Sequence, residues 1–149
     1  MSNSQRRWFR LEWLARIQEL ADLDTQKRAW LNAHPRTGNP HFSFVEYATT
    51  YENFANWPDR VSEGLISPEE AEAVTHLDKL VLDYRPPGSD DFDHEAILAD
   101  HRWLEVVRAA GEAQERLRTM IKDTDEQITL TRPSSDAIEA CISSDPAGQ

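Results

Sequence analysis

Apolar side chains recur every three or four residues near the start of the chain, which is the spacing of one helix face. Phe9, Trp13 and Ile17 mark that face and predict an amphipathic helix from about Ser4 to Leu23. The charged side chains of this segment fall mainly outside the apolar face: Arg6, Arg10, Arg16 and Glu19.

Two further helices are predicted before position 58. Asp24 can cap the first of them, because its carboxylate can accept hydrogen bonds from the free backbone N–H groups of the next turn. Two prolines and a glycine between Asn32 and Pro40 then forbid a continuous helix. From Ser43 the aromatic residues follow helical spacing until Trp57-Pro58. A strand over 42–47 stays open as an alternative, although the period favours a helix.

The next helix has the clearest start. Residues 67–70 read Ser-Pro-Glu-Glu, a capping box in which Ser67 and Glu70 satisfy each other's backbone N–H groups, with proline at the first helical position. This helix is predicted to stop at residues 86–88, Pro-Pro-Gly. Asp93 is expected to cap a single turn, and Asp100 to cap a last long helix over about 101–122.

The helical period fades after Asp123, where residues 128–131 could form a brief extended segment. We therefore expect one helical domain over 1–122 and a loosely ordered tail over 123–149. Each long helix has a single apolar side that must be buried against another helix. The predicted fold is all-α, an irregular bundle of four main helices plus short helical pieces.

The formal net charge of the 149 residues is −11. The excess is local, because residues 37–100 hold fourteen Asp and Glu but only three Lys and Arg. Such a field attracts cationic partners and repels nucleic acid and anionic membranes, so neither is an expected partner. Cys141 is the only cysteine, which excludes an internal disulfide and fits a cytoplasmic protein. No apolar run suggests a signal peptide or membrane anchor.

The sequence contains none of the short motifs that bind phosphates or cofactors or carry nucleophiles, so we expect no enzyme and no cofactor. An acidic loop offers one alternative, a small metal-binding or enzymatic domain, since Asp and His together suit a divalent metal. Asp93 is also explained as a helix cap. The candidate ligands are Asp91, Asp93, His94 and His101.

The acidic middle of the chain is interleaved with aromatic residues. Tyr and Trp are favoured interface anchors, and acidic groups steer a basic partner towards them. This pattern predicts an acidic protein-binding module, although a merely solubilising surface or a regulatory or scaffold subunit stays open. The proposed contact residues are Tyr47, Tyr51, Trp57, Asp59, Glu63, Asp78, Asp83, Tyr84, Asp90, Asp91, Phe92 and Asp93.

Arginines beside Trp8 give the N-terminal helix a basic start. Arginine with an aromatic side chain can stack on nucleic-acid bases, but the global charge opposes this use. The other readings are a solvated helix face or ion pairs with the acidic middle of the same chain.

Three segments resemble small helical immunity proteins, which accompany bacterial polymorphic or contact-dependent toxins. They are residues 64–71, 84–87 and 93–103, and the likeness is one of size, acidity and texture across 40–122. The resemblance implies a cytoplasmic protein that plugs a cationic toxin, often a nuclease. It carries over no individual residues.

Overall fold

The computed structural model describes residues 2–31 and 43–133, and these residues form an all-helical bundle without strands. The predicted break over 32–40, Cys141 and positions 134–149 of the predicted tail lie outside the described residues. A short 3-10 turn, η3, spans Pro87–Ser89. The α-helices are α1 (Asn3–Ala21), α2 (Leu23–Leu31), α3 (Phe44–Ala55), α4 (Pro68–Asp83), α5 (His94–Ala99), α6 (His101–Met120) and α7 (Thr124–Thr131).

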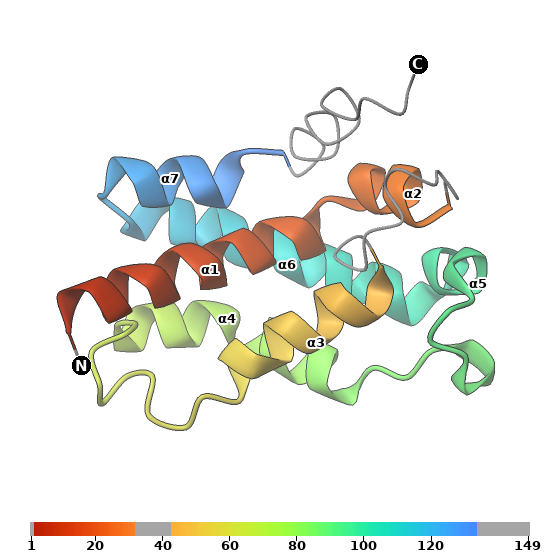
Figure 1. Ribbon diagram of the computed structural model, residues 1–149, viewed down its shortest axis with the longest axis horizontal. Helices are drawn as coiled ribbons and strands as arrows, with labels where there is room; N and C mark the ends of the chain where they lie inside the picture. Colours follow the sequence, from red (N-terminus) through yellow and green to blue (C-terminus); the bar gives the residue numbers. More distant parts are fainter. Residues whose placement is uncertain (1, 32–42, 134–149) are drawn as a thin grey trace, which may run out of the picture.

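Helix α1 runs through the middle of the bundle. It packs against α6, α7 and α3, while α4 lies along α6 (Figure 1). The short helices α2 and α5 pack together at one end, and the loop after α3 turns at the other (Figure 1). In the described ranges, no helix combines the length and apolar character needed to cross a membrane.

Aromatic rings hold the core at the end formed by α2 and α5. Trp103 of α6 is fully buried and packs edge-to-face on Phe44, with ring centres 5.3 Å apart. The rings of Trp30 and Tyr84 also pack on Trp103, with ring centres 5.7 and 5.2 Å from it. Such pairs add about 0.5–1.5 kcal/mol each beyond the burial of their area. The all-α bundle predicted from periodicity is confirmed.

Helix starts predicted from short-range capping are mostly confirmed. Ser67 and Glu70 form the capping box at α4, and Asp93 and Asp100 cap α5 and α6. The predicted cap at Asp24 is wrong.

Asp22 fills that role, because it ends α1 and accepts from the backbone N–H of Thr25 at 3.1 Å. Helix α1 begins at Asn3, next to the predicted start at about Ser4, and a capping box formed by Ser2 and Gln5 precedes it.

The prediction of an extended segment at 128–131 is wrong, because α7 occupies Thr124–Thr131. Asp123 caps this helix, but its only buried apolar side chain is Leu130, so no apolar period signals it. Tertiary contacts hold it instead, including Gln127 Nε2 donating to the carbonyl of Arg118 at 2.7 Å. The predicted domain boundary at 122 thus falls just before a helix that packs on α1.

Candidate functional site

Four of the proposed contact residues lie in the core and not on a surface, which corrects the prediction for them. Tyr47, Tyr51 and Tyr84 are 1%, 0% and 8% exposed, and Asp78 is 8% exposed. The tyrosines sit on the apolar helix faces, and two of them direct their hydroxyls to carboxylates. Tyr51 donates to Asp78, and Tyr84 donates to Asp100 at 2.8 Å. Buried phenols usually find such acceptors, although the hydroxyl of Tyr47 has none among the described residues.

Asp78 is the centre of a buried polar network that joins α3, α4 and the loop between them. Its second oxygen accepts from Arg60 Nη2 at 2.6 Å. Burial raises the pKa of Asp78, although the hydrogen bonds from Tyr51 and Arg60 act in the opposite direction. Burial likewise raises the pKa of Tyr51, and the neighbouring Asp78 raises it further. The carboxylate of Asp78 and the phenol of Tyr51 are structural and lie out of reach of a partner protein.

The remaining contact residues separate into two groups at opposite ends of the bundle (Figure 1). The first group lies on the loop after α3, where Asp59 and Glu63 are exposed and Trp57 is half-buried. The second lies between the end of α4 and the start of α5. Its members are all exposed: Asp83, Asp90, Asp91, Phe92 and Asp93. The sequence pattern therefore joined residues that the fold does not bring into one patch.

The second group contains a projecting segment, residues 90–93, which we call the acidic tip. It follows η3, whose Gly88 has φ +63°, a left-handed conformation that suits glycine. The carboxylate of Asp90 accepts from the backbone N–H of Phe92 at 3.0 Å, and Asp93 caps α5. Phe92 is 76% exposed, which is unusual for a large apolar side chain between carboxylates.

The alternative metal ligands do not assemble. His94 is held between backbone groups, with Nδ1 3.2 Å from the carbonyl of Trp30 and Nε2 accepting from the N–H of Phe44 at 3.4 Å. His101 is exposed on α6 and faces Glu105 at 3.1 Å. Among the described residues, no three His, Cys, Asp or Glu side chains form a cluster suited to a metal ion.

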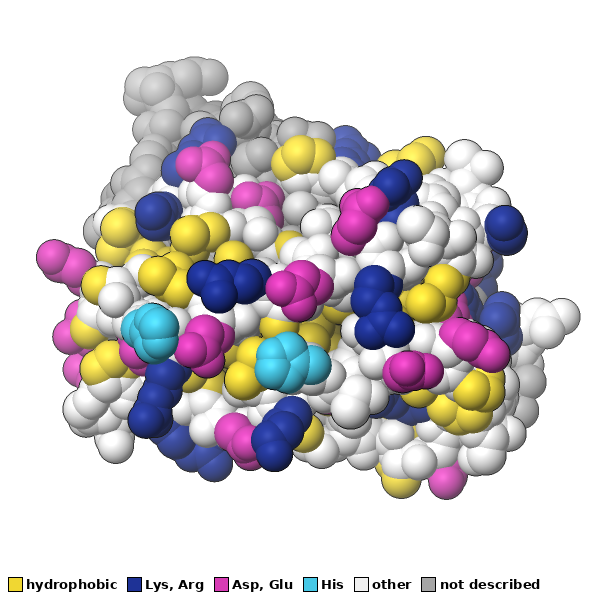
Figure 2. Space-filling model, turned by 180° about the vertical axis from the view of Figure 1, so that it is seen from behind, with side chains coloured by type: hydrophobic (Ala, Val, Ile, Leu, Met, Phe, Trp, Pro, Cys, Tyr) yellow, Lys and Arg dark blue, Asp and Glu magenta, His cyan; other side chains and the backbone are white. Residues whose placement is uncertain are grey.

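The acidity is also less one-sided than the sequence implies. On the face turned away from the viewer of Figure 1, Asp and Glu side chains lie among Lys and Arg side chains (Figure 2). Glu70 and Asp78, which both belong to the acidic middle, are buried against arginines. The field of the chain remains negative, but this face carries no continuous patch of one sign.

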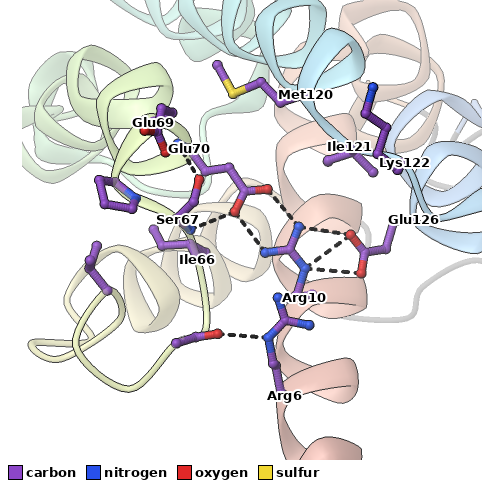
Figure 3. A pocket seen from close by; sticks show the side chains of 13 residues that line it. Arg6, Arg10, Ile66, Ser67, Glu69, Glu70, Met120, Ile121, Lys122 and Glu126 are labelled. Atoms are coloured by element: carbon purple, nitrogen blue, oxygen red, sulfur yellow. Dashed lines mark hydrogen bonds and ion pairs between the residues drawn. The ribbon is translucent and has the colours of Figure 1, made fainter.

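A cleft of about 650 Å³ between α1, the start of α4 and the segment leading into α7 was not predicted from the sequence. At its base, Arg10 lies between Glu70 and Glu126 (Figure 3). Its Nη2 is 2.7 Å from Glu70 and 2.9 Å from Glu126. Arg6, on the rim, donates from Nε to the carbonyl of Gly64 at 2.8 Å.

All five N–H groups of Arg10 are used inside the protein. Nη1 donates to Glu70 and to the carbonyl of Leu65, and Nε donates to Glu126. Burial alone would lower the pKa of Arg10, but the two carboxylates more than offset it and raise the pKa. For Glu70 the effect of burial has the opposite sign and would raise the pKa of the carboxyl. The hydrogen bonds from Arg10 and Ser67 nevertheless bring this pKa below its usual value. Arg10 and its two carboxylates therefore link the helices α1, α4 and α7 at the base of the cleft.

Arg10 was expected outside the apolar face, and this expectation is wrong. The alternative that N-terminal arginines pair with the acidic middle of the chain is confirmed for Arg10 through Glu70. A sequence signal existed, because Arg10 stands three, four and seven residues before Trp13, Leu14 and Ile17, in line with the buried stripe.

Comparison with known proteins yields no match to a family model, to a curated protein or to a solved structure. The fold and surface define a class only, a small all-helical bundle with an exposed acidic and aromatic segment. Any more particular assignment depends on the geometry of that segment.

Proposed function

We propose that this protein is an acidic binding module that neutralises a basic protein partner, in the manner of an immunity protein that blocks a toxin. The observation that carries the proposal is the acidic tip. There the side chain of Phe92 is 76% exposed, and its neighbours Asp91 and Asp93 are exposed as well.

The chemistry of the tip suits this role. A single exposed aromatic ring can fill an apolar socket on a partner and supply much of the contact energy. The surrounding carboxylates raise the rate of encounter with a positively charged surface and select against acidic partners. The net charge of −11 acts in the same direction over longer distances.

The partner to test is the protein encoded by the neighbouring reading frame. Only the C-terminal domain of that protein is expressed. Binding is measured by calorimetry at low and high salt, and neutralisation by survival of cells that express both proteins. The key variant is Phe92→Ala. The matched control is Ile128→Ala on α7, since Ile128 is another exposed apolar side chain, at 51%, but lies away from the tip.

We expect Phe92→Ala to weaken binding by about 2 kcal/mol, roughly thirtyfold, whereas the control keeps wild-type affinity. Affinity should also fall as salt rises, because exposed charges are screened. The proposal is wrong if the protein encoded by the neighbouring reading frame does not bind. It is also wrong if the affinity changes neither with salt nor in the Phe92→Ala variant.

A further inference from the structure

The loop after α3 lies at the end of the bundle opposite the acidic tip (Figure 1). A second hollow, of about 620 Å³, lies against this loop. It opens between the end of α3, the loop after it and the first turn of α4. We call it the loop pocket. Two uncharged polar residues complete its lining, and the others are Ala55, Trp57, Pro58, Arg60, Val61 and Ala71. Its volume is in the range of binding pockets, and its lining combines apolar side chains with polar groups and one charged side chain.

The loop that forms this pocket is held in place from within. Two backbone N–H groups, of Leu65 and Ile66, donate to the carbonyl of Arg60, and both of these side chains are buried. Gly64 has φ +74°, which lets the chain turn back towards α1. A partner would thus meet a loop that is already folded and would lose little affinity to the ordering of its backbone.

Arg60 gives the pocket a specific polar demand. Its Nη2 is engaged by Asp78, but Nη1 is buried and has no acceptor in the described part of the chain. A buried donor without an acceptor is costly. Because Asp78 already neutralises the charge, the missing group is best supplied by a neutral carbonyl oxygen. The lining must part slightly to admit it, since Nη1 is covered.

The rim of the pocket is acidic. Asp59 and Glu63 are exposed on the same loop, and Glu63 also accepts from the indole N–H of Trp57 at 3.1 Å. Arg6 contacts this loop at Gly64, on the side of the cleft, and Arg60 is paired with Asp78. The surroundings of the pocket therefore favour a positively charged occupant.

We propose that the loop pocket binds a polypeptide segment that presents a bulky apolar side chain next to a lysine or arginine. The apolar side chain lies against Trp57 and Val61, and the backbone carbonyl of the segment accepts from Arg60 Nη1. The neighbouring cation faces Asp59 and Glu63. The inference adds a second contact to the proposed function but stands without it, because its test uses no toxin.

The test is an NMR titration of the whole protein with blocked dipeptides, followed at the indole N–H of Trp57. The Trp57→Phe variant identifies this signal among the five tryptophans. Acetyl-leucyl-lysine amide should shift the signal saturably in the millimolar range or tighter. Acetyl-leucyl-glutamate amide should bind at least about threefold more weakly, the effect of a screened surface charge. Acetyl-glycyl-lysine amide should not bind.

Two variants locate the site. Ala71→Met fills the pocket from a partly buried helix position and should abolish saturable binding. Arg60→Lys keeps a cation beside Asp78 but removes Nη1, the proposed donor to the carbonyl of the peptide. This variant should weaken binding by about fivefold, the effect of one hydrogen bond. Ile128→Ser on α7 is the control and should leave binding unchanged. Absence of saturable binding, equal binding of the lysine and glutamate peptides, or unchanged binding in Ala71→Met overturns the proposal.

Discussion

Replacement of Arg10 by methionine offers the most direct test of the structure. Methionine has a similar length but carries no charge, so the change leaves Glu70 and Glu126 facing each other at 6% exposure each. Removal of one partner from a buried ion pair costs about 3–5 kcal/mol, because the remaining charge is uncompensated. For a domain of this size, the melting temperature should fall by roughly 6–20 °C.

The matched control is Arg7→Met, on the same helix and also paired with carboxylates of the α7 segment. Arg7 contacts Asp123 and Asp125, but its side chain is 46% exposed. An exposed pair of this kind contributes about 1 kcal/mol or less. Urea unfolding, followed by circular dichroism and tryptophan fluorescence, gives both free energies of unfolding on one scale.

A triple variant separates loss of charge balance from loss of packing. Arg10→Met, Glu70→Gln and Glu126→Leu together remove all three charges, while glutamine keeps the capping bond to Ser67. Neutral replacement of a whole buried triad is often harmless, so at least half of the lost stability should return. If Arg10→Met costs no more than Arg7→Met, or if the triple variant is no better than the single one, the triad is not buried as described.

Three further outcomes follow from the same contacts. Tyr51→Phe removes a donor to buried Asp78 and should cost about 1.5–3 kcal/mol of unfolding free energy, measured in urea. Ser67→Ala removes the cap of α4 and should cost about 1 kcal/mol in the same assay, whereas a cost near zero would contradict the capping box. Glu70 has a lowered pKa in the folded state, so its contribution is present above its unfolded pKa and is lost as pH falls through the folded value. The stability gap between wild type and Glu70→Gln should therefore shrink between pH 7 and pH 3, and a constant gap would refute this sign.

Features set by near neighbours in the chain were predictable. Ser67, Asp93 and Asp100 each cap a helix through backbone groups two or three residues away, so the spacing alone identifies them. The partners of Arg10 are 60 and 116 residues away, and no local pattern encodes them. Helix α7 escaped prediction for the same reason, since distant contacts hold it.

The tyrosines of α3 show a different kind of error. Tyr47 and Tyr51 stand on the stripe whose spacing predicted the helix, and the same spacing implies that they face the core. Their assignment to a partner surface rested on residue type and set that implication aside. Phe92 shows the converse, since it follows no helical period and is exposed.

Some carboxylates are paired inside the protein and others are exposed. We therefore expect charge and direct contact to affect different steps of binding. Long-range attraction depends on the net charge, to which the buried pair of Asp78 and Arg60 contributes nothing. Arg10 with Glu70 and Glu126 contributes one negative charge. Asp91 is exposed with no structural hydrogen bond in the described chain, so Asp91→Asn should slow association and weaken its salt dependence without altering the fold. Loss of the Phe92 ring should instead speed dissociation, because the loss of a short-range contact mainly raises the dissociation rate constant. An acidic tip that steers and anchors a partner thus requires the two variants to change different rate constants.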